Sequence, residues 1–478
     1  MKILLVNPPT GFSYGILGIS RPPLGLAYIA AVARKRHEVE IVDFNVGKAN
    51  WRTYPYGRFD VVGISTDTTR CNEALRIAEL AKRKGAIVVA GGPHVSFLDE
   101  EALSSGVIDY VVRGEGEYTF LSLLDALSGT SRLEEVCGVS YLEEGRKGGR
   151  FIRNPDASPI ADLDGLPFPA RDLLRFDLYR EKMNGRPMTT MVTSRGCPFN
   201  CEFCSSSQFM GVSWRARSAE SIIAEAELLY EKHGYRAISF VDDNFTLNPA
   251  RAIKISEMMI AKKWDLIWAA MSRVDTIVRN PDMIRTMARA GFSWTFIGFE
   301  SGSQEALDSY GKKAQVEDAL KAMRILKDNG VQATGAFILG APDETKAMMR
   351  ETIRFAKRLN PRRAQFSILT PYPGSRLYDR AKDRLLTRNW SRYSGMHPTM
   401  ALDHLSPWQL RAMHASAYSS FYGRPAKAIE NMGYIFRTLP ALSGKLSLKA
   451  METPANLAVY PVLCAWKWLV GVQRPMGS

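Results

Sequence analysis

Ser194-Arg-Gly-Cys197-Pro-Phe-Asn-Cys201-Glu-Phe-Cys204 places three cysteines within eight residues, directly after a segment that reads as a β-strand. The other cysteines, at positions 71, 137 and 464, stand alone, which does not fit a disulfide framework. Three thiolates on one loop can bind an iron-sulfur cubane. A [4Fe-4S] cluster takes four ligands, so one iron is left open for a small molecule. Zinc is the alternative, but it favours a fourth Cys or a nearby His, and the nearest is His233.

The chain around this loop alternates strand-like and helix-like segments. Strands are predicted at 188–194, 238–242, 267–272, 294–299, 334–339 and 365–369. Helices are predicted between them at 219–230, 250–261, 281–290, 316–329 and 346–359. Six such units predict a partial (β/α)6 barrel over residues 187–380, with its chemistry at the carboxyl ends of the strands.

Residues 1–130 show the same alternation at shorter intervals. Strands are predicted at 2–7, 39–44, 61–65, 87–90 and 110–113, and helices at 24–35, 71–84 and 118–127. This pattern predicts a Rossmann-like α/β domain that binds its ligand at the carboxyl ends of the strands. No Gly-x-Gly-x-x-Gly opens the first helix, which argues against a dinucleotide. Another nucleotide, or a purely structural role, remains an alternative.

The remaining segments are less regular. Residues 131–186 are rich in proline and are predicted to be a linker. Residues 381–478 are predicted to be mostly helical. From Pro361 to the end there are 16 Lys and Arg against 5 Asp and Glu, which is most of the net charge of +14. A basic surface of this kind suits a membrane surface, a nucleic acid or an acidic protein partner.

No apolar stretch is long enough to span a bilayer. The start, Met1–Thr10, runs into a strand without a basic segment and cleavage site, so we expect a cytoplasmic protein. The apolar segment 457–470 is either a helix packed on the barrel or a peripheral contact with a membrane or a hydrophobic partner.

The loop Cys197-x-x-x-Cys201-x-Phe203-Cys204 resembles that of the radical S-adenosylmethionine (SAM) enzymes, and the resemblance extends over the barrel. It implies that the three cysteines bind the cluster, that the open iron chelates SAM, and that one electron cleaves SAM to a 5'-deoxyadenosyl radical. It places Phe203 near the adenine. The further SAM contacts that it implies, at the ends of successive strands, are Asp242, Asp243, Arg273, Glu300, Ser301 and Gly340. The alternatives are a helix cap for the two aspartates and a surface ion pair for the arginine.

The amino-terminal sheet resembles the cobalamin-binding domain that precedes many radical SAM barrels. Small residues after strands carry the resemblance, because they leave a slot for a nucleotide tail: Ser65, Gly91 and Gly92, with the turn at Gly114 and Glu115. The other candidate cobalamin contacts are Thr66, Asp67, Thr69, Arg70 and His94, although a lone His in a turn is more often a hydrogen-bonding residue. Typical corrinoid domains carry Asp-x-His-x-x-Gly after the first strand, whereas residues 7–15 lack a His. The resemblance therefore implies a cobalt without a His lower ligand.

Together the two resemblances imply a cobalamin-dependent radical SAM C-methyltransferase that uses a ferredoxin- or flavodoxin-type electron donor. The expected substrate is a protein side chain, as in methyl-coenzyme M reductase, or a hydrophobic tetrapyrrole or lipid, and no nucleic-acid partner is expected. An anaerobic oxidative cyclase or rearrangement enzyme is the first alternative, and a non-catalytic corrinoid carrier is the second. A methylthiotransferase would need three further amino-terminal cysteines, and only Cys71 and Cys137 are present there.

Overall fold

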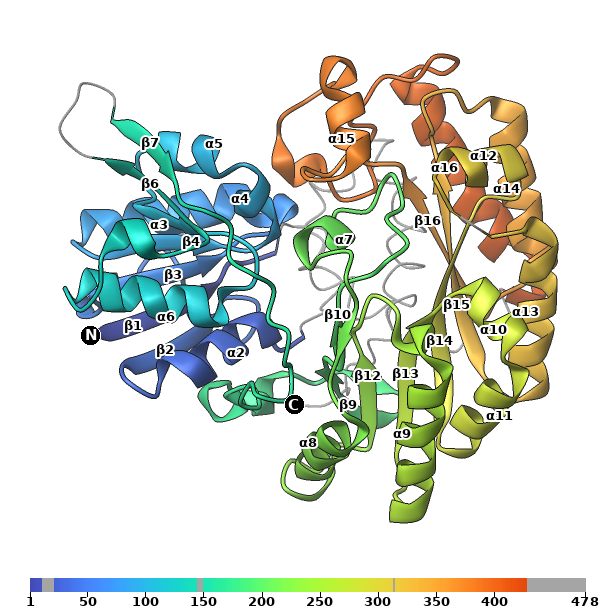
Figure 1. Cartoon of the computed structure of the whole chain (residues 1–478). Helices are drawn as coiled ribbons and strands as arrows, with labels where there is room; N and C mark the ends of the chain where they lie inside the picture. Colours follow the sequence, from blue (N-terminus) through green and yellow to red (C-terminus); the bar gives the residue numbers. More distant parts are fainter. Residues whose placement is uncertain (11–20, 144–148, 313, 428–478) are drawn as a thin grey trace.

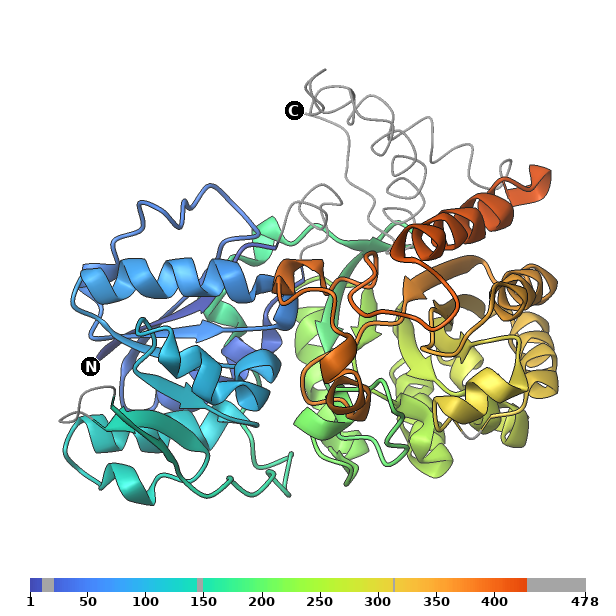
Figure 2. The same ribbon diagram turned by 90° about the horizontal axis from the view of Figure 1, so that it is seen from above.

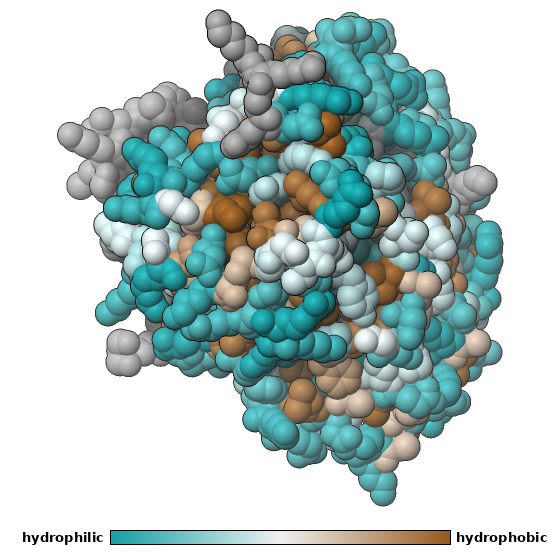
Figure 3. All heavy atoms as spheres, turned by 60° about the vertical axis from the view of Figure 1, so that its left-hand side comes forward, coloured by the Kyte–Doolittle hydropathy of each residue, from teal (hydrophilic) through white to brown (hydrophobic). Residues whose placement is uncertain are grey.

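The computed structural model describes residues 1–10, 21–143, 149–312 and 314–427. Two α/β domains lie side by side, each built on a seven-stranded sheet (Figures 1 and 2). The face of the amino-terminal domain in Figure 3 is mostly hydrophilic, with smaller apolar patches between the polar side chains. None of the helices in the described ranges combines the length and apolar character that a membrane span needs.

The amino-terminal sheet begins with five parallel strands in the order β2-β1-β3-β4-β5. They are β1 (Lys2–Asn7), β2 (Glu38–Asp43), β3 (Val61–Ser65), β4 (Ile87–Gly91) and β5 (Tyr110–Val112). Successive apolar side chains of β1 point to opposite faces of the sheet, so that Leu4 packs under one helical layer and Leu5 under the other. One layer holds α3 (Cys71–Arg83), α4 (Pro93–Phe97) and α5 (Asp99–Ser104), and the other holds α2 (Leu24–Ala33) and α6 (Gly116–Leu127).

The segment 131–186, predicted as a linker, differs from that prediction in its first part. It contains β6 (Val139–Glu143) and β7 (Arg150–Arg153), two antiparallel strands that extend the amino-terminal sheet beyond β5. Both strands are short, and β7 has no fully buried residue, so they lack the continuous apolar run of a buried parallel strand. Buried Arg113 ties them to the domain by donating to Ser140 and to the carbonyl of Asn154. Residues 154–181 connect the two sheets and contain only short 3-10 turns.

Six parallel strands form the second sheet, which stays open, so the predicted partial (β/α)6 barrel is confirmed. They are β9 (Arg186–Met191), β12 (Ala237–Phe240), β13 (Ile267–Ser272), β14 (Phe292–Glu300), β15 (Gln332–Leu339) and β16 (Arg363–Ile368), with β8 (Lys182–Met183) antiparallel at the β9 edge. The outer helices are α8 (Ala219–Glu231), α9 (Pro249–Lys262), α10 (Val274–Arg279), α11 (Pro281–Arg289), α12 (Gln304–Ser309), α13 (Val316–Asp328) and α14 (Lys346–Leu359). The core between them centres on fully buried Trp268, whose indole donates to the carbonyl of Ala290.

The carboxyl-terminal region joins the two domains. α15 (Arg376–Arg380) lies over the space between them (Figures 1 and 2), and α16 (Pro407–Tyr422) packs on β16 and α14. A Cβ at Gly374 would overlap the ring of Phe97 on α4, so the chain passes the amino-terminal domain in direct contact. The apolar segment 457–470 lies outside the described residues.

Candidate functional site

A two-stranded ribbon frames the cysteine loop. β10 (Ser194–Arg195) pairs with β11 (Arg215–Ala216), and the loop between them carries α7 (Ser206–Phe209). The amide of Cys197 donates to the carbonyl of Gly211 at 3.2 Å. Gly196 has φ +83°, and a Cβ there would collide with the carbonyls of Gly211 and Ser213. Only glycine fits this crossing, so the Gly before the first cysteine is a requirement of the loop.

Glu202, between the second and third cysteines, anchors the outer side of the loop. Its carboxylate pairs with Arg376 at 3.0 Å and with Arg380 at 3.5 Å. Its amide donates to the carbonyl of Tyr310 at 3.0 Å. The two arginines come from α15, far along the chain, and no sequence signal links them to the loop.

The cysteine side chains are half-buried and free. Burial raises the pKa of the Cys201 thiol, whereas Lys312 and Arg273 act in the opposite direction. Among the described residues, those of this loop included, no three His, Cys, Asp or Glu side chains are grouped so that they could hold a single ion such as zinc. Three thiols from one loop fit the donor set of a cubane with one open iron, and Cys197, Cys201 and Cys204 would hold it.

Unpaired polar groups gather behind the loop, at the ends of two adjacent strands. Arg273 follows β13, and its guanidinium lies 3.5 Å from the ring centre of Phe199 and pairs with Asp275 at 3.0 Å. Among the described residues its Nη2 has no hydrogen-bond partner, and neither do Ser272 Oγ and Asn244 Nδ2, all of them buried. Such groups are costly unless a ligand satisfies them. A free guanidinium nitrogen beside the cluster loop fits the carboxylate of SAM.

The two aspartates after β12 have different surroundings. Asp242 is buried and accepts from the amide of Thr193 and from Ser194 Oγ, both at 2.7 Å. Its oxygens therefore tie β12 to the start of the cysteine loop. Asp243 is exposed and accepts only from Ser206 Oγ at 2.7 Å. Of the two, Asp243 has the capacity left for an amino group.

Glu300, at the end of β14, is buried at φ +60° and forms an ion pair with Lys312. The ammonium of Lys312 also donates to the carbonyl of Gly298, so the carboxylate is fixed in one orientation. Ser301 points elsewhere, because its Oγ bonds Thr352 Oγ1 on α14 at 3.0 Å. Glu300 stays a candidate SAM contact, and Lys312 is a residue that the sequence pattern did not reveal.

Phe203, which the resemblance places near the adenine, and Gly340 lie at the same side of the barrel. Phe203 packs edge-to-face on Tyr310, with ring centres 5.7 Å apart. Gly340, at φ +94°, donates its amide to Glu344, and burial raises the pKa of that carboxyl to about 7. The buried hydroxyl of Tyr310 and the second oxygen of Glu344 have no hydrogen-bond partner in the described part of the chain. These unpaired groups fit a purine, which offers both donors and acceptors.

A cavity of about 250 Å³ opens beside β3 and β4 of the amino-terminal sheet. Five of the predicted cobalamin residues line it: Ser65, Gly91, Gly92, Gly114 and Glu115. Gly92 has φ +103°, and a Cβ there would come within 2.6 Å of the carbonyl oxygen of Thr66. Val192, Arg195, Phe209 and Met210 of the second domain close the cavity. A slot walled by glycines fits a nucleotide tail.

A second cavity, of about 420 Å³, lies between the domains. Asn7, Asp67, Thr69 and Arg70 line one side, and Arg70 is held by Asp67 and by Asn7 Oδ1 at 2.5 Å. Ser205, the residue after Cys204, lines the same cavity. The candidate corrin contacts thus face the cysteine loop across one space.

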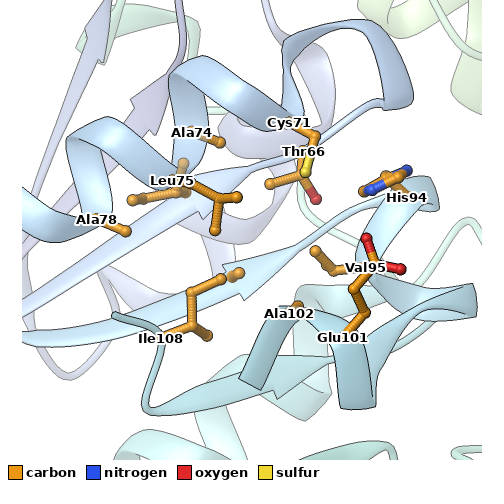
Figure 4. Close-up of a pocket in the computed structure, with 12 residues that line it drawn as sticks. Thr66, Cys71, Ala74, Leu75, Ala78, His94, Val95, Glu101, Ala102 and Ile108 are labelled. Carbon is orange, nitrogen blue, oxygen red and sulfur yellow. The ribbon is translucent and has the colours of Figure 1, made fainter. Parts of the chain in front are cut away.

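His94 and Thr66 lie apart from this space. They line a small cavity of about 30 Å³ with Cys71 and Glu101 (Figure 4). The His94 ring contacts Trp390, and burial lowers its pKa to about 4. His94 therefore has the surroundings of a packed core residue, and Thr66 Oγ1 donates to the carbonyl of Gly91 at 2.8 Å.

Replacement of one cysteine tests the cluster loop. Cys201→Ala leaves two protein thiolates, so we expect loss of the reconstituted cluster and of SAM cleavage, measured as iron per chain and as 5'-deoxyadenosine. Exposed Cys137→Ala is the control and should keep both. A Cys201→Ala protein with a full cluster and active SAM cleavage would contradict the assignment.

Arg273→Met removes the guanidinium, whose Nη2 has no partner among the described residues, while keeping bulk. A lost charged hydrogen bond costs roughly 1.5–3 kcal/mol, so the dissociation constant of SAM should rise about 10- to 100-fold. Equilibrium dialysis with the cluster-loaded protein measures it. Arg289→Met, at an exposed arginine on α11, is the matched control. Unchanged SAM affinity in the Arg273 variant would remove this residue from the site.

Ser65→Leu fills the glycine-walled cavity without touching the interdomain space. Overpacking a close-fitting slot costs roughly 1–3 kcal/mol, so cobalamin should bind about tenfold more weakly or not at all. The absorbance of the protein-bound corrin reports the binding. Ser65→Ala keeps the slot open and should bind as the parent does. Equal binding by the leucine variant would place the tail elsewhere.

Comparisons with known proteins agree with this geometry. Residues 191–356 match the radical SAM superfamily, and residues 18–124 match the B12 binding domain. An uncharacterized methyltransferase of Pyrococcus horikoshii is 41% identical over 91% of this chain and 96% of its own. The anaerobic magnesium-protoporphyrin IX monomethyl ester cyclase of Rubrivivax gelatinosus is 26% identical over 88% of this chain and 77% of its own. The hopanoid C-3 methylase of Methylococcus capsulatus is 28% identical over 84% and 76%.

Two solved structures share the fold. The radical SAM methyltransferase TsrM of Kitasatospora setae superposes with a TM-score of 0.67 at 18% identity, covering 89% of both chains. The cobalamin-dependent radical SAM enzyme OxsB superposes with a TM-score of 0.72 at 20% identity, covering 97% of this chain and 72% of its own. With the cysteine loop, the glycine-walled cavity and the near-full-length relative at 41% identity, this chain belongs to the cobalamin-dependent radical SAM methyltransferase family and uses a [4Fe-4S] cluster, SAM and cobalamin.

Proposed function

We propose that this enzyme methylates an unactivated carbon of a hydrophobic small molecule, a tetrapyrrole or a lipid. The observation that carries the proposal is the interdomain cavity of about 420 Å³. It joins the Asp67–Arg70 segment of the cobalamin-binding domain to Ser205, the residue that follows the last cysteine. A substrate carbon in this space would lie between the two cofactor sites, which is the proximity that a methyl transfer to carbon requires.

When bound, the cluster with SAM supplies a hydrogen-abstracting radical and the cobalamin supplies the methyl group. The protein's own residues hold the parts in place. Arg273 and Asp243 would orient the charged end of SAM, and Glu300, fixed by Lys312, would accept from the ribose hydroxyls. Tyr372 and Pro373 cover the cavity from the carboxyl-terminal side and would limit the access of water to it. Members of the superfamily need a one-electron donor, and we propose one of the ferredoxin or flavodoxin type.

The substrate class rests on the relatives. A hopanoid methylase and a magnesium-protoporphyrin cyclase both resemble this chain over more than four fifths of its length. Their named substrates are extended and largely apolar. An apolar substrate also gains binding energy from leaving water, in proportion to the area that the cavity buries.

A protein side chain, as in methyl-coenzyme M reductase, is the second candidate. Between residues 361 and 427 the sequence has 11 Lys and Arg against 3 Asp and Glu. Arg388 and Arg392 are exposed in this region, on the segment that covers the amino-terminal domain. Such a surface favours an acidic protein, and a membrane contact through the same region belongs to the lipid version of the proposal.

The products distinguish methyl transfer from its alternative. The anaerobically reconstituted enzyme is incubated with SAM, a reductant and a candidate tetrapyrrole, lipid or peptide, and the products are measured by mass spectrometry. Transfer predicts a gain of one methylene and two SAM consumed per product, one as methyl donor and one as radical source. Loss of hydrogens or gain of oxygen would instead establish the oxidative cyclase reaction. If the enzyme methylated a peptide but none of the tetrapyrroles or lipids, its substrate would be a protein side chain and not a hydrophobic small molecule.

A further inference from the structure

Four charged side chains form a buried cluster where the two domains meet. Arg195 pairs with Glu115 at 2.7 Å and with Glu117 at 2.6 Å. Arg215 pairs with the other oxygen of Glu115 at 2.8 Å. Each of these side chains is at most 10% exposed. Two carboxylates from one domain thus balance two guanidinium groups from the other, away from water.

The partners in this charge cluster belong to the two cofactor sites. Glu115 and Glu117 lie in the Gly114–Glu117 turn, which leads into α6 and includes the first two residues of that helix. All four of its residues line the cavity of about 250 Å³ that fits the nucleotide tail. Arg195 and Arg215 are the paired residues of β10 and β11, the two ends of the cysteine loop. Arg215 also donates to the carbonyl of Met210 within that loop at 2.7 Å. Arg195 and Met210 line the tail cavity as well.

The cluster is geometrically tight. Glu115 uses one oxygen for Arg195 and the other for Arg215 and for the amide of Ile160 at 2.7 Å. Although burial acts in the opposite direction, hydrogen bonds from the two arginines lower the pKa of Glu115. Arg195 directs one guanidinium nitrogen to each carboxylate, and Arg215 divides its two terminal nitrogens between Glu115 and the carbonyl of Met210. Charged hydrogen bonds from several nitrogens of one planar group fix orientation as well as distance. A shift of the Gly114–Glu117 turn would therefore move both ends of the cysteine loop.

We propose that Glu115, Glu117, Arg195 and Arg215 are positioning residues that couple the two cofactor sites. Seating the nucleotide tail fixes the turn, the turn holds the two arginines, and the arginines set the cysteine loop in its cluster-binding shape. Because coupling of this kind is reciprocal, a bound cluster also raises the affinity for cobalamin. The inference rests on the two cofactors and does not depend on the substrate or on methyl transfer.

The test compares cobalamin affinity with and without the cluster. Hydroxocobalamin is titrated into the full-length apoprotein and into the iron-sulfur-reconstituted protein, and binding is followed by absorbance and tryptophan quenching. For the parent protein we expect the cluster to tighten cobalamin binding about fivefold or more. Glu115→Gln keeps the shape of the side chain but removes its charge. In this variant the affinity ratio, which is the dissociation constant of cobalamin without the cluster divided by that with it, should fall to about one. Equal affinities in the parent, or an unchanged ratio in the variant, would overturn the proposal.

Glu225→Gln is the matched control. Glu225 is another buried carboxylate that holds two arginines, Arg171 and Arg217, but it does not line the tail cavity. The Glu225→Gln variant should lose stability and keep the parent's affinity ratio. If its ratio also fell to about one, the effect of Glu115→Gln would reflect a general loss of stability, and the proposed coupling would be contradicted.

A second measurement covers the case that Glu115→Gln does not fold. In Arg215→Lys the charge remains, but the separate nitrogens that contact Glu115 and the carbonyl of Met210 are lost. Hydrogen exchange over residues 196–216 is measured before and after addition of hydroxocobalamin to the cluster-free protein. Slower exchange in the parent and little change in the lysine variant support the coupling. Equal protection in both, or none in the parent, contradicts it.

Discussion

A carbon radical must meet its methyl group before it reacts with anything else, so two cofactors on two domains have to share one space. Both sheets of this chain are built mainly from parallel strands, so the loops that follow the strands lie at one edge of each sheet. The Asp67–Arg70 segment after β3 and the cysteine loop after β9 therefore open on the same cavity. The carboxyl-terminal region then packs across both domains, with Trp390 against His94 on one side and α16 against β16 on the other.

Charged side chains hold the cysteine loop from three directions. Asp242 ties its start to β12, Glu202 ties its middle to the arginines of α15, and Glu115 ties both of its ends to the cobalamin-binding domain. A buried ion pair is weak support for stability as such, because desolvation offsets much of its attraction. Its directional bonds do fix where a loop lies, and the loop that carries an iron-sulfur cluster needs that precision more than it needs stability.

The sequence predicted the parts that depend on local pattern. Periodicity located the six barrel strands and five strands of the first sheet. Ser65, Gly91 and Gly92, which the resemblance to cobalamin-binding domains singled out, line one cavity. Strands β6 and β7 escaped because short, half-exposed antiparallel strands resemble loops. The sequence did not predict the ion pairs of Lys312, Arg376 and Arg195, because their partners are distant in the chain. The sequence did not show that Asp242 and Ser301 form hydrogen bonds within the protein. Their partners, Thr193 and Thr352, are brought to them only by tertiary packing.

Radical formation in this enzyme requires that three thiolates leave one iron open and that SAM occupies it. Electron paramagnetic resonance of the reduced, reconstituted protein, recorded before and after SAM is added, tests this most directly. We expect the signal of a reduced [4Fe-4S] cluster whose g-values shift when SAM binds the open iron. A spectrum that stays the same at saturating SAM, or a protein that assembles no such cluster, would contradict it.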